Sequence, residues 1–110
     1  MHNAIQLAAG DNVATLLADA AKGDRVAILS ANNDIIGELT CLQAIPFGNK
    51  VAVSAIDEGH TIIKGGYPVG RAIAAIPVGQ LVHVQNVRSL RLDIPDNIID
   101  EIIKQMGIEA

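Results

Sequence analysis

The sequence has few of the residues that nucleic-acid binding and disulfide pairing require. Its 110 residues include one Cys, one Phe, one Tyr and no Trp, and 12 Asp+Glu outnumber 8 Lys+Arg. Binding to nucleic acid depends on clustered cations and on aromatic rings that stack on bases, so no nucleic-acid partner is expected. A single Cys allows no intramolecular disulfide. Cys41 lies in an apolar stretch, which is typical of a buried structural thiol.

Long hydrophobic runs and a basic leader are missing as well. No apolar run approaches the roughly 18 residues that cross a membrane, and the first residues lack the basic stretch that opens a signal peptide. The sequence therefore predicts a cytoplasmic protein without a membrane segment. A chain of 110 residues forms one domain with room for a single core, so an elaborate active site is expected to need a partner.

Isoleucine and valine dominate the apolar half of the chain, with 16 and 9 copies. These β-branched side chains favour strands, and a short turn pattern with a central Gly occurs four times. We expect each Gly to take a positive φ and, in the two segments that carry Pro, a type I turn followed by a Gly bulge. The pattern predicts a mainly β fold with about six to eight short strands. The four segments are residues 19–26, 44–51, 55–62 and 75–82.

A helix-like spacing of apolar residues occurs near the N-terminus. Residues 13–20 place apolar side chains at positions i, i+3, i+4 and i+7, after Asp11 and Asn12, which are both good N-caps. Taken alone, this pattern predicts a helix.

A second apolar stripe lies near the C-terminus. Asp93 and Pro95 are start signals and Gly107 is a stop signal, so we expect a helix of about three turns within residues 93–107. Its apolar face either packs on its own domain or docks on another subunit, and the sequence leaves both open. The stripe consists of Ile94, Ile98, Ile99, Ile102, Ile103 and Met106.

Of the three histidines, His83 has the sequence neighbours most typical of a binding site. Residues 81–87 alternate as in a strand, which puts His83 and Gln85 on one face, with Asn86 at its end. This polar face is either a binding site or the solvent-exposed face of an antiparallel sheet. No spacing among the three His residues places two ligands on one face, so the residues alone give a weak metal signal.

Two cations lie close to glycines. Lys64 precedes Gly65 and Gly66, whose bare backbone would let a carboxylate or a phosphate approach, or the segment is a hairpin with a solvated Lys. Lys50 follows the turn at residues 46–49. No Ser-His-Asp order, Cys-His pair or close carboxylate pair is visible, so we expect the chain to be inactive alone.

Several of these motifs occur together, in this order, in one family. The sequence resembles the small SAF-type domain of the altronate/galactarate dehydratases over residues 5–88. In that family the domain either begins a long dehydratase chain or forms a separate small subunit, as in sulfolactate sulfo-lyase, and this chain is similar in length to the separate subunit. The motifs are Asp11-Asn12-Val13-Ala14, Ile45-Pro46-x-Gly48-x-Lys50-Val51-Ala52, Ile56-x-x-Gly59, Ile63-Lys64-x-Gly66-x-x-Val69-Gly70-x-Ala72 and Val82-His83-x-x-Asn86-Val87.

The resemblance implies a β-clip fold, which is a bent arrangement of short hairpins, over residues 5–88, followed here by the helix at 93–107. It implies a strand rather than a helix at residues 13–17. It also implies a two-component lyase of the dehydratase type, which eliminates water or sulfite from a hydroxylated carboxylic acid such as a sugar acid and whose large subunit completes catalysis. The alternative is a non-catalytic β-clip binding module that self-associates into a homo-oligomer through its C-terminal helix.

The resemblance also gives the polar residues a role. Lys64, His83, Asn86, Lys50 and Asp11 would face the large subunit and contact the small carboxylic-acid substrate. His83 would in addition be a metal ligand, because the family implies a divalent metal, iron(II) or manganese(II), in the assembled enzyme.

This chain departs from its relatives at three positions where they often carry His. Ala8, Asn49 and Gln85 stand there instead, and amide side chains replace a neutral imidazole poorly as metal ligands. Two explanations stay open: this chain binds metal weakly or not at all, or the large subunit holds the metal and the substrate differs.

Overall fold

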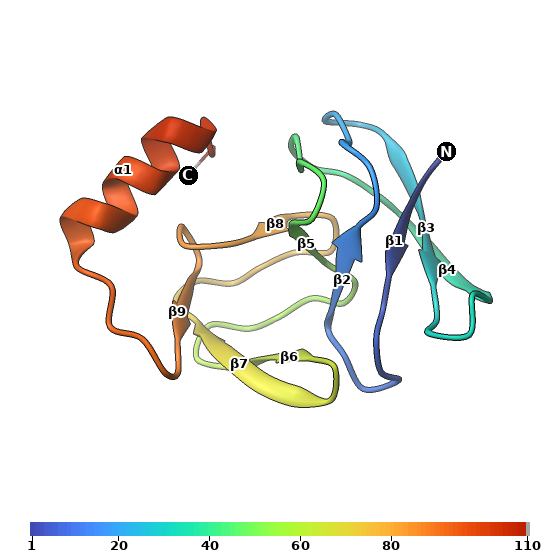
Figure 1. The fold of residues 1–110 in the computed structure, drawn as a ribbon, viewed down its shortest axis with the longest axis horizontal. Helices are drawn as coiled ribbons and strands as arrows, with labels where there is room; N and C mark the ends of the chain where they lie inside the picture. The colour runs from blue at the N-terminus through green and yellow to red at the C-terminus, as the bar shows by residue number, and fades with distance from the viewer. Residues whose placement is uncertain (110) are drawn as a thin grey trace.

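The structure is a computed structural model that describes residues 1–109, and it is mainly β (Figure 1). Nine short strands precede one C-terminal helix in this part of the chain, so the predicted fold class is confirmed. The strands are β1 (His2–Ile5), β2 (Val13–Leu16), β3 (Arg25–Leu29), β4 (Ile35–Thr40), β5 (Lys50–Ala52), β6 (Thr61–Lys64), β7 (Tyr67–Ala72), β8 (Leu81–Val82) and β9 (Val87–Ser89), and the helix is α1 (Asp96–Met106).

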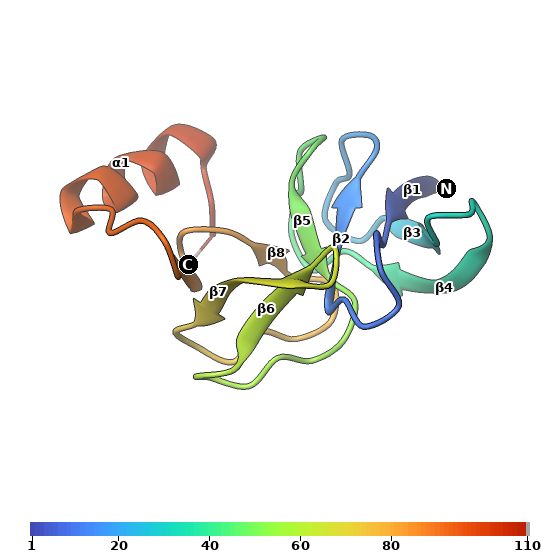
Figure 2. The same ribbon diagram turned by 60° about the horizontal axis from the view of Figure 1, so that its bottom comes forward.

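The strands form two sheets. Six strands pair in the order β4-β3-β1-β2-β5-β8, and three pair in the order β6-β7-β9. β1 and β3 are parallel, whereas their other partners in the larger sheet run antiparallel. The β3–β4 hairpin lies at one end of the molecule and α1 at the other, beyond β9 (Figure 1). Turned forward, the molecule shows the β6–β7 hairpin next to β5 and β8 (Figure 2).

Three strands of the larger sheet, β2, β5 and β8, bury both of their faces. Successive side chains of a strand point to opposite sides, and here each side carries its own hydrophobic core. The first core lies within the larger sheet, and the second lies between that sheet and the smaller one. Ala14, Val51 and Leu81 belong to the first core. Val13, Ala52 and Val82 belong to the second core.

The helix that the apolar spacing predicts at residues 13–20 is wrong, and the strand implied by the family resemblance is right. Residues 13–16 form β2, which pairs with β1 and β5. A strand buried on both faces has no polar alternation. Its continuous apolar sequence therefore fits the helical template by chance.

The Gly of each repeated turn takes a positive φ, as predicted, between 83° and 91°. The predicted turn type, a type I turn followed by a Gly bulge, is wrong. The N–H of Asn49 donates to the carbonyl of Pro46 at 3.1 Å, which puts Gly48 at the third position of the turn. A positive φ at that position, without one at the preceding residue, defines a type II turn rather than a type I turn with a bulge. The four residues are Gly23, Gly48, Gly59 and Gly79.

The C-terminal helix begins and ends where the sequence signals predict. Pro95 occupies the N-cap position and Gly107 ends the helix in the left-handed conformation. The N–H of Gly107 donates to Lys104 and the N–H of Ile108 donates to Ile103, which is a Schellman motif. Ile108 packs against the first core, so the end of the helix is anchored on its own domain. In the described part of the chain, no helix is both long enough and apolar enough to cross a membrane.

Cys41 is a member of the first core, with 1% of its surface exposed. Burial raises the pKa of its thiol, and the nearby carboxylate of Asp24 raises it further. The thiol therefore stays protonated, and the prediction of a buried structural cysteine is confirmed.

Candidate functional site

A cavity of about 490 Å³ lies between the sheets and the C-terminal segment. This volume falls in the range of small-molecule sites. Its polar wall carries four basic side chains and one carboxylate, Asp93. The basic residues are Lys50, His83, Arg88 and Arg91.

Apolar side chains complete the walls of this cavity. One group comes from the two sheets and their connections, and the other comes from the segment between β9 and α1 and from α1 itself. The first group is Ile62, Val69, Val82, Val84 and Val87. The second group is Leu90, Leu92, Ile94 and Ile99.

Lys50 and His83 line the cavity, whereas Lys64 lies outside its wall and acts on Lys50 through its charge. Lys50, half-buried on β5, has its pKa lowered by burial and then by the positive charge of Lys64, at the end of β6. Burial also lowers the pKa of His83, and Lys50 lowers it further. The described residues form no ion pair with any of these three. Lys50 and Lys64 therefore place positive charge without an ion pair beside His83, and a bound anion would stabilise it.

His83 lies in a turn and not in the strand predicted for residues 81–87. β8 ends at Val82, and a turn leads into β9. This division of residues 81–87, together with β2 at the position of a predicted helix, contributes to nine strands where about six to eight are predicted. The N–H groups of Asn86 and Val87 both donate to the carbonyl of His83, at 3.1 and 3.0 Å. Gln85 therefore does not share a strand face with His83.

The ring of His83 is oriented by its own turn. The N–H of Val84 donates to Nδ1 of His83 at 2.8 Å, so Nδ1 is an acceptor and the neutral ring carries its proton on Nε2. Because the lowered pKa keeps the ring neutral near pH 7, Nε2–H is a hydrogen-bond donor. A metal ligand of the usual kind has the opposite tautomer, with Nε2 free and Nδ1–H donating.

Asn86 holds the turn that carries His83. Its Oδ1 accepts from the N–H of His83 at 3.0 Å, and its Nδ2 donates to the carbonyl of Leu81 at 2.9 Å and to Oε1 of Gln80 at 3.2 Å. The side chain is 4% exposed. Its polar atoms are thus engaged within the fold, and it does not line the cavity.

Asp11 holds the loop that carries Lys64. Its Oδ2 accepts from the N–H groups of Gly65 at 2.7 Å and Ala8 at 3.1 Å, and its Oδ1 accepts from Gly66 at 2.9 Å. Both glycines have a positive φ, which turns their N–H groups toward one carboxylate. Asp11 is 6% exposed and lies outside the cavity wall.

Asn12 extends the same connection, in a role that the sequence motif does not reveal. Its Nδ2 donates to the carbonyl of Thr61 at 2.9 Å, and its Oδ1 accepts from the N–H of Ile63 at 2.8 Å. A side-chain amide pairs here as a strand backbone would. The Asp11-Asn12 pair therefore attaches the β6–β7 hairpin to the larger sheet.

Replacing Asp11 with Ala is expected to lower the free energy of unfolding by about 2–3 kcal/mol, because buried carboxylate hydrogen bonds are lost. Hydrogen exchange at Gly65 and Gly66 should accelerate more than exchange in β1. The matched control is Asp19→Ala, since exposed Asp19 accepts only from the N–H of Phe47 at 2.7 Å in the described chain; about 1 kcal/mol or less is expected there. Equal losses for the two variants would contradict the role given to Asp11.

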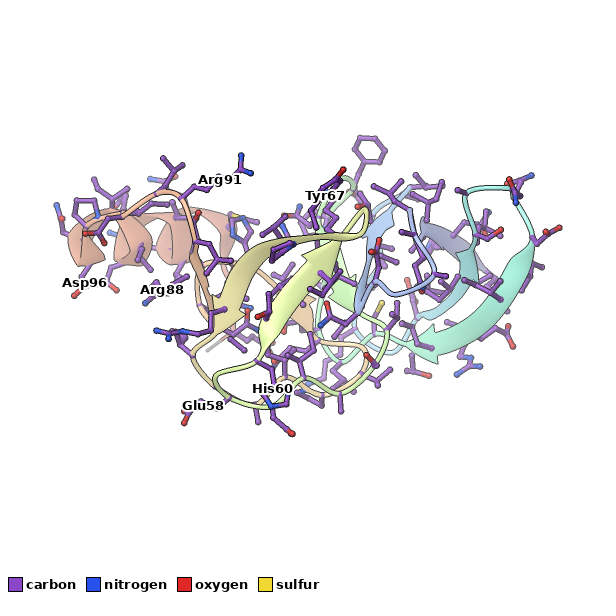
Figure 3. All side chains as sticks on the ribbon, turned by 90° about the horizontal axis from the view of Figure 1, so that it is seen from below. Glu58, His60, Tyr67, Arg88, Arg91 and Asp96 are labelled. Carbon is purple, nitrogen blue, oxygen red and sulfur yellow. The ribbon has the colours of Figure 1, made fainter. Side chains whose placement is uncertain are left out.

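Arg88 and Arg91 line the cavity although the sequence motifs do not single them out. Arg88 belongs to β9 and Arg91 to the segment that leads from β9 to α1; Figure 3 labels both. One guanidinium nitrogen of Arg88 donates to the carbonyls of Val84 at 2.5 Å and Val87 at 3.1 Å, which ties it to the turn of His83. Their sequence signal is weak: one lies in the last strand and the other shortly after it, in a chain with few cations.

The described residues do not fit a metal centre. Residues 1–109 bring together no group of three or more His, Cys, Asp or Glu side chains able to hold a metal ion. His83, the predicted ligand, has cations beside it and a hydrogen bond on Nδ1. A metal role for His83 stays a prediction that needs ligands from another chain.

Comparison with known proteins places most of the chain in one domain type. The family model of the altronate/galactarate dehydratase SAF domain matches residues 2–90. Altronate dehydratase of Escherichia coli (strain K12) is 40% identical over 85 residues, 77% of this chain and 16% of that protein. Altronate dehydratase of Bacillus subtilis (strain 168) is 31% identical over 94 residues, 86% of this chain and 18% of that protein.

A shorter relative matches over nearly its whole length. The alpha subunit of (2R)-sulfolactate sulfo-lyase of Paracoccus pantotrophus is 36% identical over 64 residues, which are 58% of this chain and 92% of that protein. The chain thus spans less than a fifth of the two dehydratases.

Proposed function

Because the chain belongs to the altronate/galactarate dehydratase SAF-domain family, we propose that it is the small subunit of a two-component lyase. The reaction eliminates water or sulfite from a hydroxylated carboxylic acid such as a sugar acid, and a large subunit completes catalysis. The observation that carries this proposal is the cavity lined by Lys50 and His83, which offers positive charge and an N–H donor. It suits a carboxylate.

Each residue of the predicted site has a part in this proposal. Loss of the proton next to a carboxylate moves negative charge onto the carboxylate oxygens, and fixed cations in a partly buried site stabilise that charge. Lys50 and His83 contact the carboxylate, and Lys64 adds its charge at the same face. Asp11 and Asn86 are positioning residues, since they hold the segments that carry Lys64 and His83.

A partner is required because the cavity lacks a complete set of reacting groups. Among the described residues, Asp93 is the one carboxylate in its wall. The wall's lysine and arginines are cations, and Nδ1 of neutral His83 already accepts from the N–H of Val84. A shorter relative is by its name an alpha subunit, and 92% of its length is matched. We therefore assign the base, and any metal, to the large subunit.

The test is to co-express the full chain with a protein that resembles the remainder of an altronate dehydratase and to assay the purified pair on altronate and sulfolactate. Lys64→Ala and His83→Ala are expected to lower kcat/KM by about tenfold or more, as for a lost charge-assisted hydrogen bond, with unchanged melting temperature. Lys22→Ala, at an exposed turn, is the control. Full activity of the chain alone, or no loss in either variant, would refute the proposal.

The exposed apolar residues of the C-terminal segment favour a second candidate, a self-associating binding module. Leu90, Leu92 and Ile98 are 54%, 68% and 46% exposed, and exposed apolar residues of this kind occur at protein interfaces. This candidate predicts a stable homo-oligomer that Ile98→Asn dissociates, and no complex with a large subunit. Light scattering coupled to size-exclusion chromatography distinguishes the two.

A further inference from the structure

The chain after β9 forms a strap, residues 90–107, that is fixed to the domain at both of its ends. It begins after Ser89, the last residue of β9, and the residue that follows it, Ile108, packs against the first core. Between these ends, residues 90–94 and Ile99 belong to the cavity wall. Figure 1 and Figure 2 both show α1, the helical part of the strap, apart from the strands of both sheets. The strap therefore closes one side of the site without belonging to either sheet.

The strap has almost no polar attachment to the domain. The N–H groups of Arg91 and Leu92 donate to Oγ of Ser89, both at 3.1 Å. Among residues 1–109, no hydrogen bond or ion pair joins the strap to any residue before Ser89. Residues 90–98 are exposed, apart from half-buried Ile94. Apolar burial is therefore what holds the strap in place.

That burial depends mainly on one side chain. Ile99 is the one buried side chain among residues 90–107, with 4% of its surface exposed, and it lines the cavity. It belongs to neither of the two cores. A helix of 11 residues is marginally stable in water by itself, so α1 depends on the burial of Ile99. A segment with so few buried contacts opens locally while the rest of the domain stays folded.

The closed strap would favour binding of a carboxylate at Lys50 and His83. It reduces the access of water to the wall that these two residues share, and electrostatic attraction is stronger where water is excluded. A ligand that binds the closed state more tightly shifts the equilibrium toward that state. Ligand binding and closure of the strap are therefore expected to be coupled.

We propose that residues 90–107 open locally and close over a carboxylate bound at Lys50 and His83, with Ile99 as the anchor of the closed state. This rests on the proposed function in taking a carboxylate as the ligand. It goes further in assigning a conformational role to a segment that follows the matched domain, since the family match ends at residue 90.

The first test follows amide hydrogen exchange of the full chain by NMR without a ligand. We expect the amides of α1 to exchange faster than those of β2 and β5. Ile99→Ala should accelerate exchange in α1 by about tenfold or more, because the buried side chain is lost, and should leave β2 and β5 unchanged. The matched control is Ile98→Ala, which removes the same atoms from a neighbour that is 46% exposed; a change of about threefold or less is expected there.

The second test repeats the exchange measurement with altronate. Binding should shift the ring signal of His83. At a concentration ten times the Kd, altronate should slow exchange in α1 by about tenfold, because the open state does not bind it. Exchange in β2 and β5 sets the rate expected when the whole domain unfolds.

Each outcome decides the inference. Exchange in α1 at the rate of β2 and β5 overturns it, since the strap then opens only with the whole domain. Equal effects of Ile99→Ala and Ile98→Ala, or an effect of Ile99→Ala that extends to β5, overturn the role of Ile99.

The response to altronate separates this inference from the proposed function. A shift at His83 without slower exchange in α1 overturns closure and leaves the proposed function standing, since a carboxylate then still binds at His83. Absence of any shift at His83 also overturns the inference, because the strap then has no carboxylate to cover. The Lys64→Ala and His83→Ala variants of the assembled pair then decide the proposed function separately.

Discussion

Replacing Gly79 with Ala is expected to lower the free energy of unfolding by about 3–4 kcal/mol, from two sources. Gly79 has a φ of 91°, where an L side chain costs roughly 1–2 kcal/mol. A Cβ there would also overlap the backbone carbonyl oxygen of Thr40. The N–H of Gly79 donates to the carbonyl of Ala52, and its carbonyl accepts from the N–H of Leu42, both at 2.9 Å. These two hydrogen bonds hold the turn in place, so it cannot shift to relieve the overlap without breaking one of them.

The matched control is Gly59→Ala, at the same position of another repeated turn. Gly59 has a φ of 87°, but a Cβ there meets nothing within 4 Å, so the backbone cost of roughly 1–2 kcal/mol should appear alone. Urea unfolding followed by circular dichroism measures both variants. A loss in Gly79→Ala that is no greater than in Gly59→Ala would show that the turn shifts freely away from Thr40.

The turns and the helix could be predicted because their causes are local. Gly23, Gly48 and Gly59 take a positive φ wherever the surrounding chain lies, and Gly107 ends α1 through hydrogen bonds to its own last turn. The turn type was not predictable in the same way. Pro46 reads as the second residue of a type I turn, but it is the first residue of a type II turn.

The strands were harder to predict where burial is decided by distant segments. Residues 13–16 carry apolar side chains on both faces because two cores meet at β2. The sequence of this segment alone does not show that a second core packs on its other face. Likewise, residues 81–87 alternate as a strand, but the Asn86 side chain closes a turn by accepting from the N–H of His83. Side-chain hydrogen bonds of this kind compete with strand pairing.

The candidate site was predictable only in part. The sequence motifs include both Lys50 and His83, and the fold places both in one cavity wall. The same motifs include Asp11 because its carboxylate holds a loop, which sequence alone does not distinguish from substrate binding. Arg88 and Arg91 belong to no motif; Arg88 reaches the cavity from β9, and the position of Arg91 depends on the path of the chain after β9.

Lys50→Met is expected to weaken binding of altronate by about 10- to 100-fold, since a charge-assisted hydrogen bond is lost. It should also raise the pKa of His83, because the positive charge of Lys50 helps to lower it. Burial, the larger cause, remains, so the pKa should stay below its ordinary value near 6.5. The His83 ring signal in an NMR titration reports the pKa, with His2 and His60, which lie outside the cavity wall, as references.

The sign of the pH dependence follows from this lowered pKa. Just below pH 6.5 the His83 ring of the free chain is still neutral, whereas a bound carboxylate favours the protonated ring. Binding therefore takes up a proton, and affinity rises as the pH falls through this range until the free ring is protonated too. The other charged groups in the wall are Lys50, Arg88, Arg91 and Asp93.

The variants separate these contributions to binding. His83→Gln should remove the rise in affinity at low pH, and Asp93→Asn tests the one acidic group in the described wall. Lys22→Met, outside the cavity, should change neither the affinity nor the His83 titration. An unchanged His83 titration in Lys50→Met, together with unchanged affinity, would mean that the two side chains do not form one anion site. Parallel changes in both measurements instead identify Lys50 and His83 as the pair that receives the carboxylate.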